Sequence, residues 1–184
     1  MIKTTKSTLM IEEKIKAVIR DVPDFPKEGI VFKDITPIML DAALSNEIVD
    51  HLVELYKDKQ IDKIAGIESR GFLFGYPLAM RLGIPFVLIR KAGKLPYHKI
   101  SHSYDLEYGS AVIEMHVDAV QTGDRVLVHD DLLATGGSAQ AAAELIRKCG
   151  GEIAGFNFLV GLSFLNGQNK LTEYSKNITN LVAY

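Results

Sequence analysis

The chain lacks the features that direct a protein out of the cell or into a membrane. It has no tryptophan and a single cysteine, Cys149, so no disulfide bond can form within it, and a cysteine-based metal cluster is not expected. Its apolar runs, such as residues 86–89, are far shorter than the roughly 18 residues that cross a bilayer. Residues 1–8 are polar and have no apolar stretch of the kind found in secretory signals. We therefore expect a cytoplasmic protein with no membrane partner.

Acidic residues are missing from one long window of the sequence. Residues 69–104 contain no Asp or Glu, so the window carries a formal charge of +6 and the rest of the chain −8. Its basic residues are Arg70, Arg81, Arg90, Lys91, Lys94 and Lys99. Such a block is typical of a site for a polyanionic ligand, although a solvated basic surface is the alternative. Nucleic acid is not expected as a partner, because no zinc-finger pattern, RNA-binding aromatic motif or basic helix accompanies the block.

The pattern of apolar residues predicts an α/β fold. After a flexible tail over residues 1–8, helical spacing predicts helices over residues 9–21, 41–58, 71–82 and 137–149. Short apolar or alternating runs predict strands over 63–67, 85–89, 104–117 (antiparallel), 125–129, 153–162 and 178–183. This alternation indicates a central, mostly parallel sheet flanked by helices, in one domain over residues 9–184. Residues 93–103 have no periodicity and are expected to form a long, mobile loop with a functional role.

The clearest chemical signal lies in residues 126–142. A buried strand ends in Asp130 and Asp131, and a turn and an uncharged helix start follow. Because ligands bind at the carboxyl ends of parallel strands, the turn's N–H groups and the helix dipole predict a phosphate site. This turn consists of Ala134, Thr135, Gly136, Gly137 and Ser138. No lysine follows the glycines, so the motif is not a nucleoside-triphosphate loop. The two carboxylates are suited to accept hydrogen bonds from adjacent sugar hydroxyls, although an ordinary strand end is the plainer alternative.

These residues resemble a known signature. Residues 126–138 are similar to the segment with which the type I phosphoribosyltransferases bind 5-phosphoribosyl 1-diphosphate (PRPP). Further segments resemble, in the same order, those of the adenine phosphoribosyltransferase family: residues 25–37, 68–72, 90–96 and 104–109. The resemblance implies a type I phosphoribosyltransferase fold with a base-covering segment near residues 24–37. It also implies a transferase that makes AMP and diphosphate from adenine and PRPP in purine salvage.

The resemblance implies roles for individual residues. The diphosphate would be bound by Glu68, Ser69, Arg70, Lys91 and Lys94, with a cis peptide bond between Glu68 and Ser69. Adenine would stack on Phe32 and meet backbone groups of Val31 and Lys33. Glu107 is the catalytic candidate, a carboxylate that accepts a proton from the base or orients it, carried in as the loop 93–103 closes. Mg²⁺ would arrive bound to PRPP with no direct protein ligand. A homodimer is implied, in which Arg90 and the stretch near Arg81 reach towards the partner.

Each assignment has a plainer alternative in the sequence itself. Phe32 in a Val-Phe pair is typical of a core, Glu107 of a strand surface, and a pair of lysines such as Lys91 and Lys94 of a soluble face. Two other functions compete with the first: a transferase for a 6-oxopurine, and a PRPP-sensing regulator of the same fold that binds nucleic acid. The regulator is disfavoured because the chain has a net charge of −2 and no added DNA-binding element.

Three positions depart from the family pattern. His129 stands where an aliphatic residue is usual, and a histidine at a strand end is its plainest interpretation. Ser138 replaces a threonine and keeps the hydroxyl. Lys33 replaces a frequent arginine, which matters little if that position acts through its backbone but more if a guanidinium fork is needed.

Overall fold

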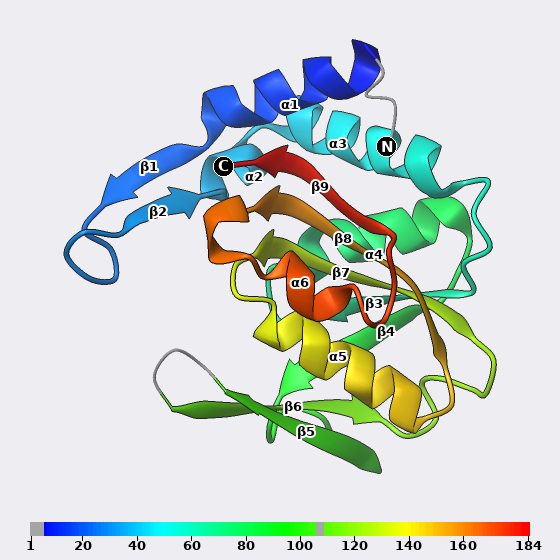
Figure 1. Ribbon diagram of the computed structural model, residues 1–184. Helices are drawn as coiled ribbons and strands as arrows, with labels where there is room; N and C mark the ends of the chain where they lie inside the picture. The colour runs from blue at the N-terminus through cyan, green and yellow to red at the C-terminus, as the bar shows by residue number, and fades with distance from the viewer. Residues whose placement is uncertain (1–5, 106–108) are drawn as a thin grey trace. The chain divides into compact units, whose positions relative to one another are not determined.

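The computed structural model describes residues 6–105 and 109–184, which form an α/β fold (Figure 1). Two compact units are distinguished along the chain, Met1–Leu55 and Tyr56–Tyr184. The first helix, α1, spans Lys6–Val18 and so begins inside the segment 1–8 that the sequence indicates as a tail. In the described part of the chain, no helix is long and apolar enough to cross a membrane.

The unit Met1–Leu55 combines helices with an antiparallel hairpin. Its further elements are β1 (Arg20–Pro23), β2 (Val31–Asp34), α2 (Thr36–Leu40) and α3 (Ala42–Tyr56). The helix expected over 9–21 is therefore wrong at its end, where Arg20 and Asp21 belong to β1. The reason is cross-strand pairing, because Asp21 lies opposite Lys33 and their side chains form an ion pair at 2.6 Å. In the same unit, Lys14 Nζ lies 2.6 Å from Glu47 and joins α1 to α3.

The unit Tyr56–Tyr184 contains a sheet that has seven strands within the described residues, in the order β5-β6-β4-β3-β7-β8-β9. The strands are β3 (Lys63–Ile67), β4 (Phe86–Lys91), β5 (Lys99–Asp105), β6 (Ser110–His116), β7 (Arg125–Leu133), β8 (Glu152–Gly161) and β9 (Ile178–Ala183). Strands β4, β3, β7, β8 and β9 are parallel, and β6 and β5 are added antiparallel at one edge. The predicted fold class is thereby confirmed.

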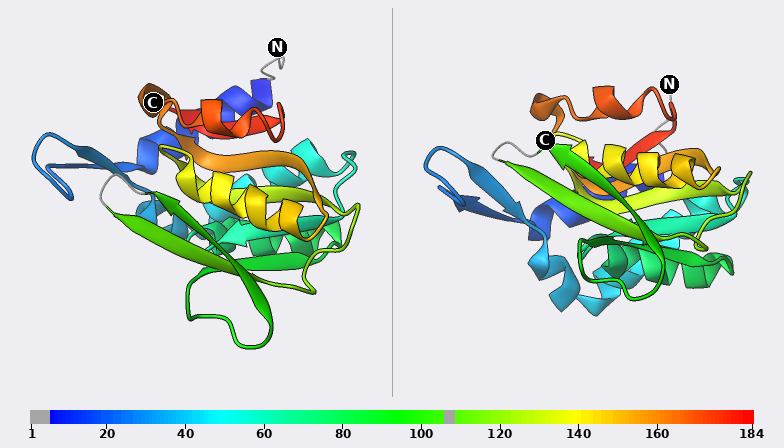
Figure 2. Two further views of the ribbon diagram at one scale, coloured as in Figure 1. Left: turned by 60° about the horizontal axis from the view of Figure 1, so that its bottom comes forward. Right: turned by 90° about the horizontal axis from the view of Figure 1, so that it is seen from below.

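Helices cover both faces of this sheet. Helix α4 (Gly71–Leu82) lies on one face and α5 (Gly137–Lys148) on the other, next to β5 (Figures 1 and 2). The helices predicted over 71–82 and 137–149 are confirmed, and Gly83 closes α4 in the left-handed conformation with φ 69°. The short elements η1 (Ser163–Leu165) and α6 (Gln168–Leu171) follow β8 and were not anticipated. They lack the length at which helical periodicity becomes visible.

The loop expected over residues 93–103 is shorter than predicted, because β5 begins at Lys99. Side chains of β5 alternate: Ile100 and Tyr104 pack against the core, whereas Ser101 and Ser103 are exposed. Strand β5 pairs with β6 along its whole length, from Lys99 opposite His116 to Asp105 opposite Ser110. The alternation is present in the sequence but weak, since its outward positions are small polar residues. The antiparallel strand predicted over 104–117 is confirmed for Ser110–His116.

A polar pair lies inside the sheet at His129. The ring is fully buried in β7, and its Nδ1 donates to Asn157 Oδ1 on β8 at 2.7 Å. The other ring nitrogen, Nε2, is buried and has no hydrogen-bond partner among the described residues. A proton added there would bury a positive charge, so burial lowers the pKa of His129 to about 4. The expectation of a strand-end histidine is wrong, because β7 continues to Leu133, and His129 is a neutral core residue in the middle of that strand at neutral pH.

Stability is expected to fall in mild acid because of His129. The folded-state pKa of about 4 lies below the ordinary value of 6.5, so the unfolded chain binds the proton first. The stabilisation is complete above pH 6.5 and is lost as the pH falls towards 4, by about 2 kcal/mol at pH 5. Urea unfolding at pH 7 and pH 5 measures this loss. The His129→Gln variant keeps a donor for Asn157 but does not titrate, so an equal loss in both proteins would contradict the assignment.

Candidate active site

The predicted phosphate turn forms a pocket at the end of β7. The pocket has a volume of about 230 Å³ and is lined by Arg70, Tyr104 and residues 130–139. Gly136 has φ 79°, and a Cβ atom there would lie 2.5 Å from the carbonyl oxygen of Gly167, so only glycine fits. Helix α5 begins at the next residue, and its first N–H groups and positive dipole end lie at the turn. The turn therefore has the chemistry of an anion cradle.

Two carboxylates lie in the same pocket. Asp131 is 4% exposed, and its Oδ2 lies 3.0 Å from Arg70 Nε. Asp130 Oδ1 accepts a hydrogen bond from the backbone N–H of Asp131 at 2.9 Å. Burial raises the pKa of Asp130 well above its usual range, and the neighbouring Asp131 charge raises it further. Burial also raises the pKa of Asp131, although Arg70 opposes that rise. The two carboxyl groups can thus form hydrogen bonds with a ligand, and a bound ligand can change their protonation and therefore their charge.

Gly71 allows α4 to pack closely against the strand that carries Asp130 and Asp131. A Cβ atom at Gly71 would lie 2.8 Å from the His129 carbonyl oxygen and 3.0 Å from Asp130 Oδ1. The missing side chain lets the first turn of α4 lie against β7. Arg70, the residue before α4, is thereby brought next to Asp131. The structure thus joins two segments, 68–71 and 130–131, that are far apart in the sequence.

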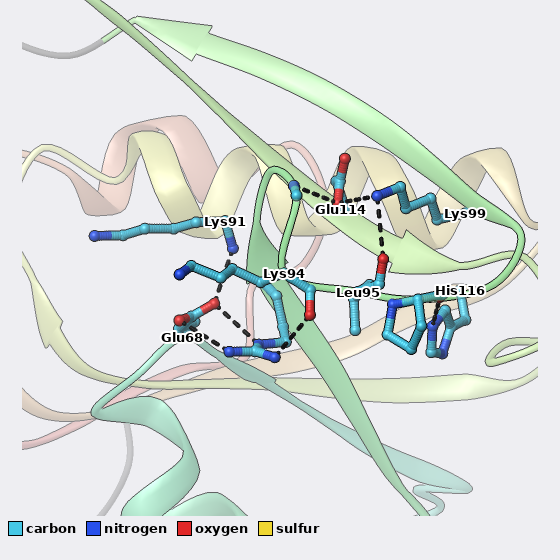
Figure 3. A network of polar contacts seen from close by, with 10 residues as sticks. Glu68, Lys91, Lys94, Leu95, Lys99, Glu114 and His116 are labelled. Carbon is cyan, nitrogen blue, oxygen red and sulfur yellow. Dashed lines mark hydrogen bonds and ion pairs between the residues drawn. The ribbon is translucent and has the colours of Figure 1, made fainter.

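The segment at the end of β3 is bonded to β4. The peptide bond between Glu68 and Ser69 is cis, as the resemblance implies. The Glu68 carboxylate accepts hydrogen bonds from Arg90 Nε at 3.1 Å, Arg90 Nη2 at 3.2 Å and the Lys91 N–H at 3.1 Å (Figure 3). Hydrogen bonding from Arg90 lowers the pKa of Glu68, so the group is charged at neutral pH. Its two oxygens bind β4, so Glu68 supports this segment with its carboxylate.

The remaining basic candidates are Lys91, the last residue of β4, and Lys94, on the turn that follows it. Lys91 and Lys94 are both exposed, and their ammonium groups extend to the same side in Figure 3. The guanidinium of Arg90 is bonded within the chain to Glu68 and to the Lys94 carbonyl oxygen, and its contact with a partner subunit stays a prediction. The acid-free window thus contributes Arg70, Lys91 and Lys94 as exposed or half-exposed cations of this unit.

The residues predicted to meet the base belong to the unit Met1–Leu55. Val31 is half exposed on β2. The Phe32 ring packs edge-on against Phe25, with ring centroids 5.2 Å apart. The Lys33 ammonium is bonded to Asp21, so the lysine side chain is engaged while its backbone remains part of the hairpin strand. This geometry favours a backbone role at that position, for which the exchange of arginine for lysine matters little.

Two further observations concern residues at the site. Tyr104 lines the pocket, and both burial and the nearby Asp130 charge raise the pKa of its hydroxyl. Its sequence neighbours do not distinguish it from the chain's other tyrosines, and only the course of β5 brings it to the pocket. The catalytic candidate Glu107 lies outside the described residues. Within the described residues, no group of three or more His, Cys, Asp or Glu side chains is placed to hold a metal ion.

Comparisons with known proteins agree with this geometry. Residues 33–179 match the family described as phosphoribosyl transferase domain. An adenine phosphoribosyltransferase of Cytophaga hutchinsonii is 50% identical over 175 residues, which cover 95% of this chain and 97% of the relative.

Solved structures of the same kind are also similar. The crystal structure of adenine phosphoribosyltransferase from Thermoanaerobacter pseudethanolicus has a TM-score of 0.89 and 49% identity, covering 94% of this chain and 99% of that one. The enzyme from Saccharomyces cerevisiae, solved with an imino-altritol bisphosphate and adenine, has a TM-score of 0.87 and 40% identity, with the same coverage. Identity and coverage at this level, together with the pocket on β7, show that the chain belongs to the adenine phosphoribosyltransferase family.

Proposed function

We propose that this chain forms AMP and diphosphate from adenine and PRPP, a reaction of purine salvage. The observation that carries the proposal is a single pocket lined by an uncharged phosphate turn, a pair of carboxylates and Arg70. A substrate that joins a phosphate, two neighbouring hydroxyls and a diphosphate on one sugar matches these three groups in chemistry. The family to which the chain belongs supports adenine as the acceptor.

In this proposal each part of PRPP has its own partners. The N–H groups of residues 134–138 and the hydroxyls of Thr135 and Ser138 bind the 5′-phosphate, supported by the dipole of α5. Asp130 and Asp131 accept hydrogen bonds from the ribose hydroxyls. Arg70, Lys91 and Lys94 bind the diphosphate, on which negative charge develops as the bond to the sugar breaks. Ser69 also binds the diphosphate, as part of the segment at the end of β3 that the Glu68 carboxylate holds against β4.

The base is bound and activated by other residues. Phe32 offers a stacking face, and backbone groups of Val31 and Lys33 hydrogen-bond the edge of adenine. The adenine ring nitrogen forms its bond to the anomeric carbon while the bond from that carbon to the diphosphate oxygen breaks. The proton of the attacking nitrogen passes to the Glu107 carboxylate, which also orients the base.

Mg²⁺ accompanies PRPP in this proposal. The ion prefers oxygen ligands and keeps several of its waters, so diphosphate and ribose oxygens suit it, beside the hard oxygen donors of Asp130 and Asp131. When bound, the ion neutralises part of the diphosphate charge. Asp130 and Asp131 bind the ribose hydroxyls rather than the ion itself. We therefore assign Mg²⁺ no direct protein ligand.

We also propose a cytoplasmic homodimer, as the family resemblance implies. Exposed apolar side chains on α4, Leu73, Tyr76 and Met80, support an association between copies. Sedimentation velocity measures this state, and a monomer at micromolar concentration would contradict it.

Adenine is expected to be preferred over hypoxanthine by about 30-fold in kcat/KM. A slot that accepts the adenine amino group leaves a buried acceptor unpaired against a 6-oxo group, which costs about 2 kcal/mol. Diphosphate release in the presence of PRPP and adenine, hypoxanthine, guanine or xanthine measures the preference and tests the function itself. Comparable rates with hypoxanthine would favour the 6-oxopurine transferase, and no release with any base would overturn the proposed function.

A further inference from the structure

The turn that carries the diphosphate lysines is held by charged side chains. Between β4 and β5, Arg90 Nη1 donates to the Lys94 carbonyl oxygen at 2.9 Å (Figure 3). The N–H of Gly93 donates to Glu114 Oε2 at 3.0 Å. Lys99 Nζ donates to the Leu95 carbonyl oxygen at 3.1 Å. Three successive residues, 93–95, are therefore tied by their backbones to side chains of the flanking strands.

Glu114 is the centre of this arrangement. It lies on β6 directly opposite Arg90 of β4 and is 7% exposed. Besides the Gly93 N–H, its Oε2 binds Lys99 Nζ at 3.0 Å. The hydrogen bond from Lys99 lowers the pKa of Glu114, so the carboxylate is charged at neutral pH. One buried carboxylate thus links the turn to β5 and β6 together.

The proposed reaction does not use Glu114 directly, because it does not line the pocket on β7. Its connections lead to the turn that carries Lys91 and Lys94, and from there through Arg90 and Glu68 to the end of β3. We infer that Glu114 is a positioning residue, which holds the turn 91–94 so that Lys91 and Lys94 are presented together to the diphosphate. The inference rests on the proposed function for the diphosphate itself.

A pre-formed turn strengthens binding because less conformational entropy is lost when the anion binds. Two lysines on a loose turn lose both backbone and side-chain freedom when they bind one anion, and that lost entropy weakens binding. Gly93 has φ 80°, a conformation that glycine adopts and leaves freely, and within the turn itself one backbone hydrogen bond, from the Lys94 N–H to the Lys91 carbonyl oxygen at 3.2 Å, keeps its shape. The hydrogen bonds from Glu114, Arg90 and Lys99 restrain the turn further, at each of residues 93–95.

The Glu114→Gln variant separates positioning from simple charge. Removing a negative charge near a diphosphate site strengthens the attraction for the anion by Coulomb's law. Glutamine loses the ion pair with Lys99 and offers the Gly93 N–H a weaker acceptor, which instead loosens the turn and weakens binding. The two effects have opposite signs, so the direction of the change decides between them.

The test measures binding of inorganic diphosphate by isothermal titration calorimetry. Glu114→Gln is expected to raise the dissociation constant about tenfold, whereas Glu152→Gln, the same exchange at an exposed position, is expected to leave it unchanged. Lys99→Gln removes the other partner of the ion pair between Glu114 and Lys99. The double variant is expected to bind no more weakly than the weaker single variant, because both changes break one connected unit. Thermal unfolding checks that each variant is folded. If Glu114→Gln does not fold, the same binding measurement on Lys99→Gln tests the proposal.

Steady-state kinetics gives a second measure. In Glu114→Gln, KM for PRPP is expected to rise by the factor seen for diphosphate, while KM for adenine stays within about twofold of wild type. Unchanged or tighter diphosphate binding, or an equal rise in both KM values, would overturn the positioning role. If the wild-type protein binds diphosphate more tightly than Glu114→Gln but makes no AMP, the proposed function fails and the positioning role stands.

Discussion

The Glu107→Gln variant is expected to form AMP about 100-fold more slowly than the wild-type protein in a single turnover, a loss of about 3 kcal/mol. Adenine must lose a proton as its ring nitrogen bonds to the sugar, and a carboxylate in position accepts it. Glutamine keeps the shape and one hydrogen-bonding oxygen but cannot accept the proton. PRPP affinity is expected to change little, because phosphate, ribose and diphosphate are bound by other residues.

Rapid-quench measurement of AMP formation with excess enzyme isolates this chemical step, and PRPP affinity is measured separately by calorimetry. Glu152→Gln is the matched control, since it makes the same exchange at an exposed residue at the start of β8. A near-normal chemical step in Glu107→Gln would mean that Glu107 has no catalytic role and that another group takes the proton.

The Asp131→Asn variant is expected to raise KM for PRPP about 50-fold and to leave the affinity for free adenine unchanged. A hydrogen bond to a charged group contributes about 1.5–3 kcal/mol, and asparagine offers the ribose hydroxyls a weaker acceptor. The change also removes the counter-charge of Arg70, which lies 3.0 Å from the Asp131 carboxylate. Steady-state kinetics with each substrate varied in turn measures the split. An equal loss of adenine affinity would contradict it, as would an AMP complex whose phosphate lies away from residues 134–138.

The pH dependence of the same pair offers an internal check. Burial raises the pKa of Asp131, so its carboxylate gains a proton at a higher pH than an exposed aspartate does. A protonated Asp131 resembles asparagine in charge. The affinity of the wild-type protein for PRPP is therefore expected to fall in mild acid towards that of Asp131→Asn, while the variant changes less.

Parts of the site could be predicted because they are contiguous in the sequence. The strand end, Asp130, Asp131 and the turn 134–138 follow one another, so that local rules for strands, glycine turns and helix starts determine their arrangement. The window without acidic residues likewise predicted a basic region, which contains Arg70, Lys91 and Lys94, and their binding of diphosphate stays a prediction. Contributions that come from distant segments were missed, such as Tyr104 in the pocket and the bond from Arg90 to Glu68.

The sequence by itself determined the α/β class, the β7 turn and its carboxylates, because each depends on hydrophobic period or on neighbouring residues. Only the tertiary structure decided that residues 99–103 form an edge strand and that Arg20 and Asp21 leave the helix for a hairpin. In both places local preference is weak, and pairing with another strand supplies the missing hydrogen bonds. Glu114 shows the same dependence: nothing around it in the sequence distinguishes it, and it acquires Gly93 and Lys99 as partners only when β4, β5 and β6 are side by side.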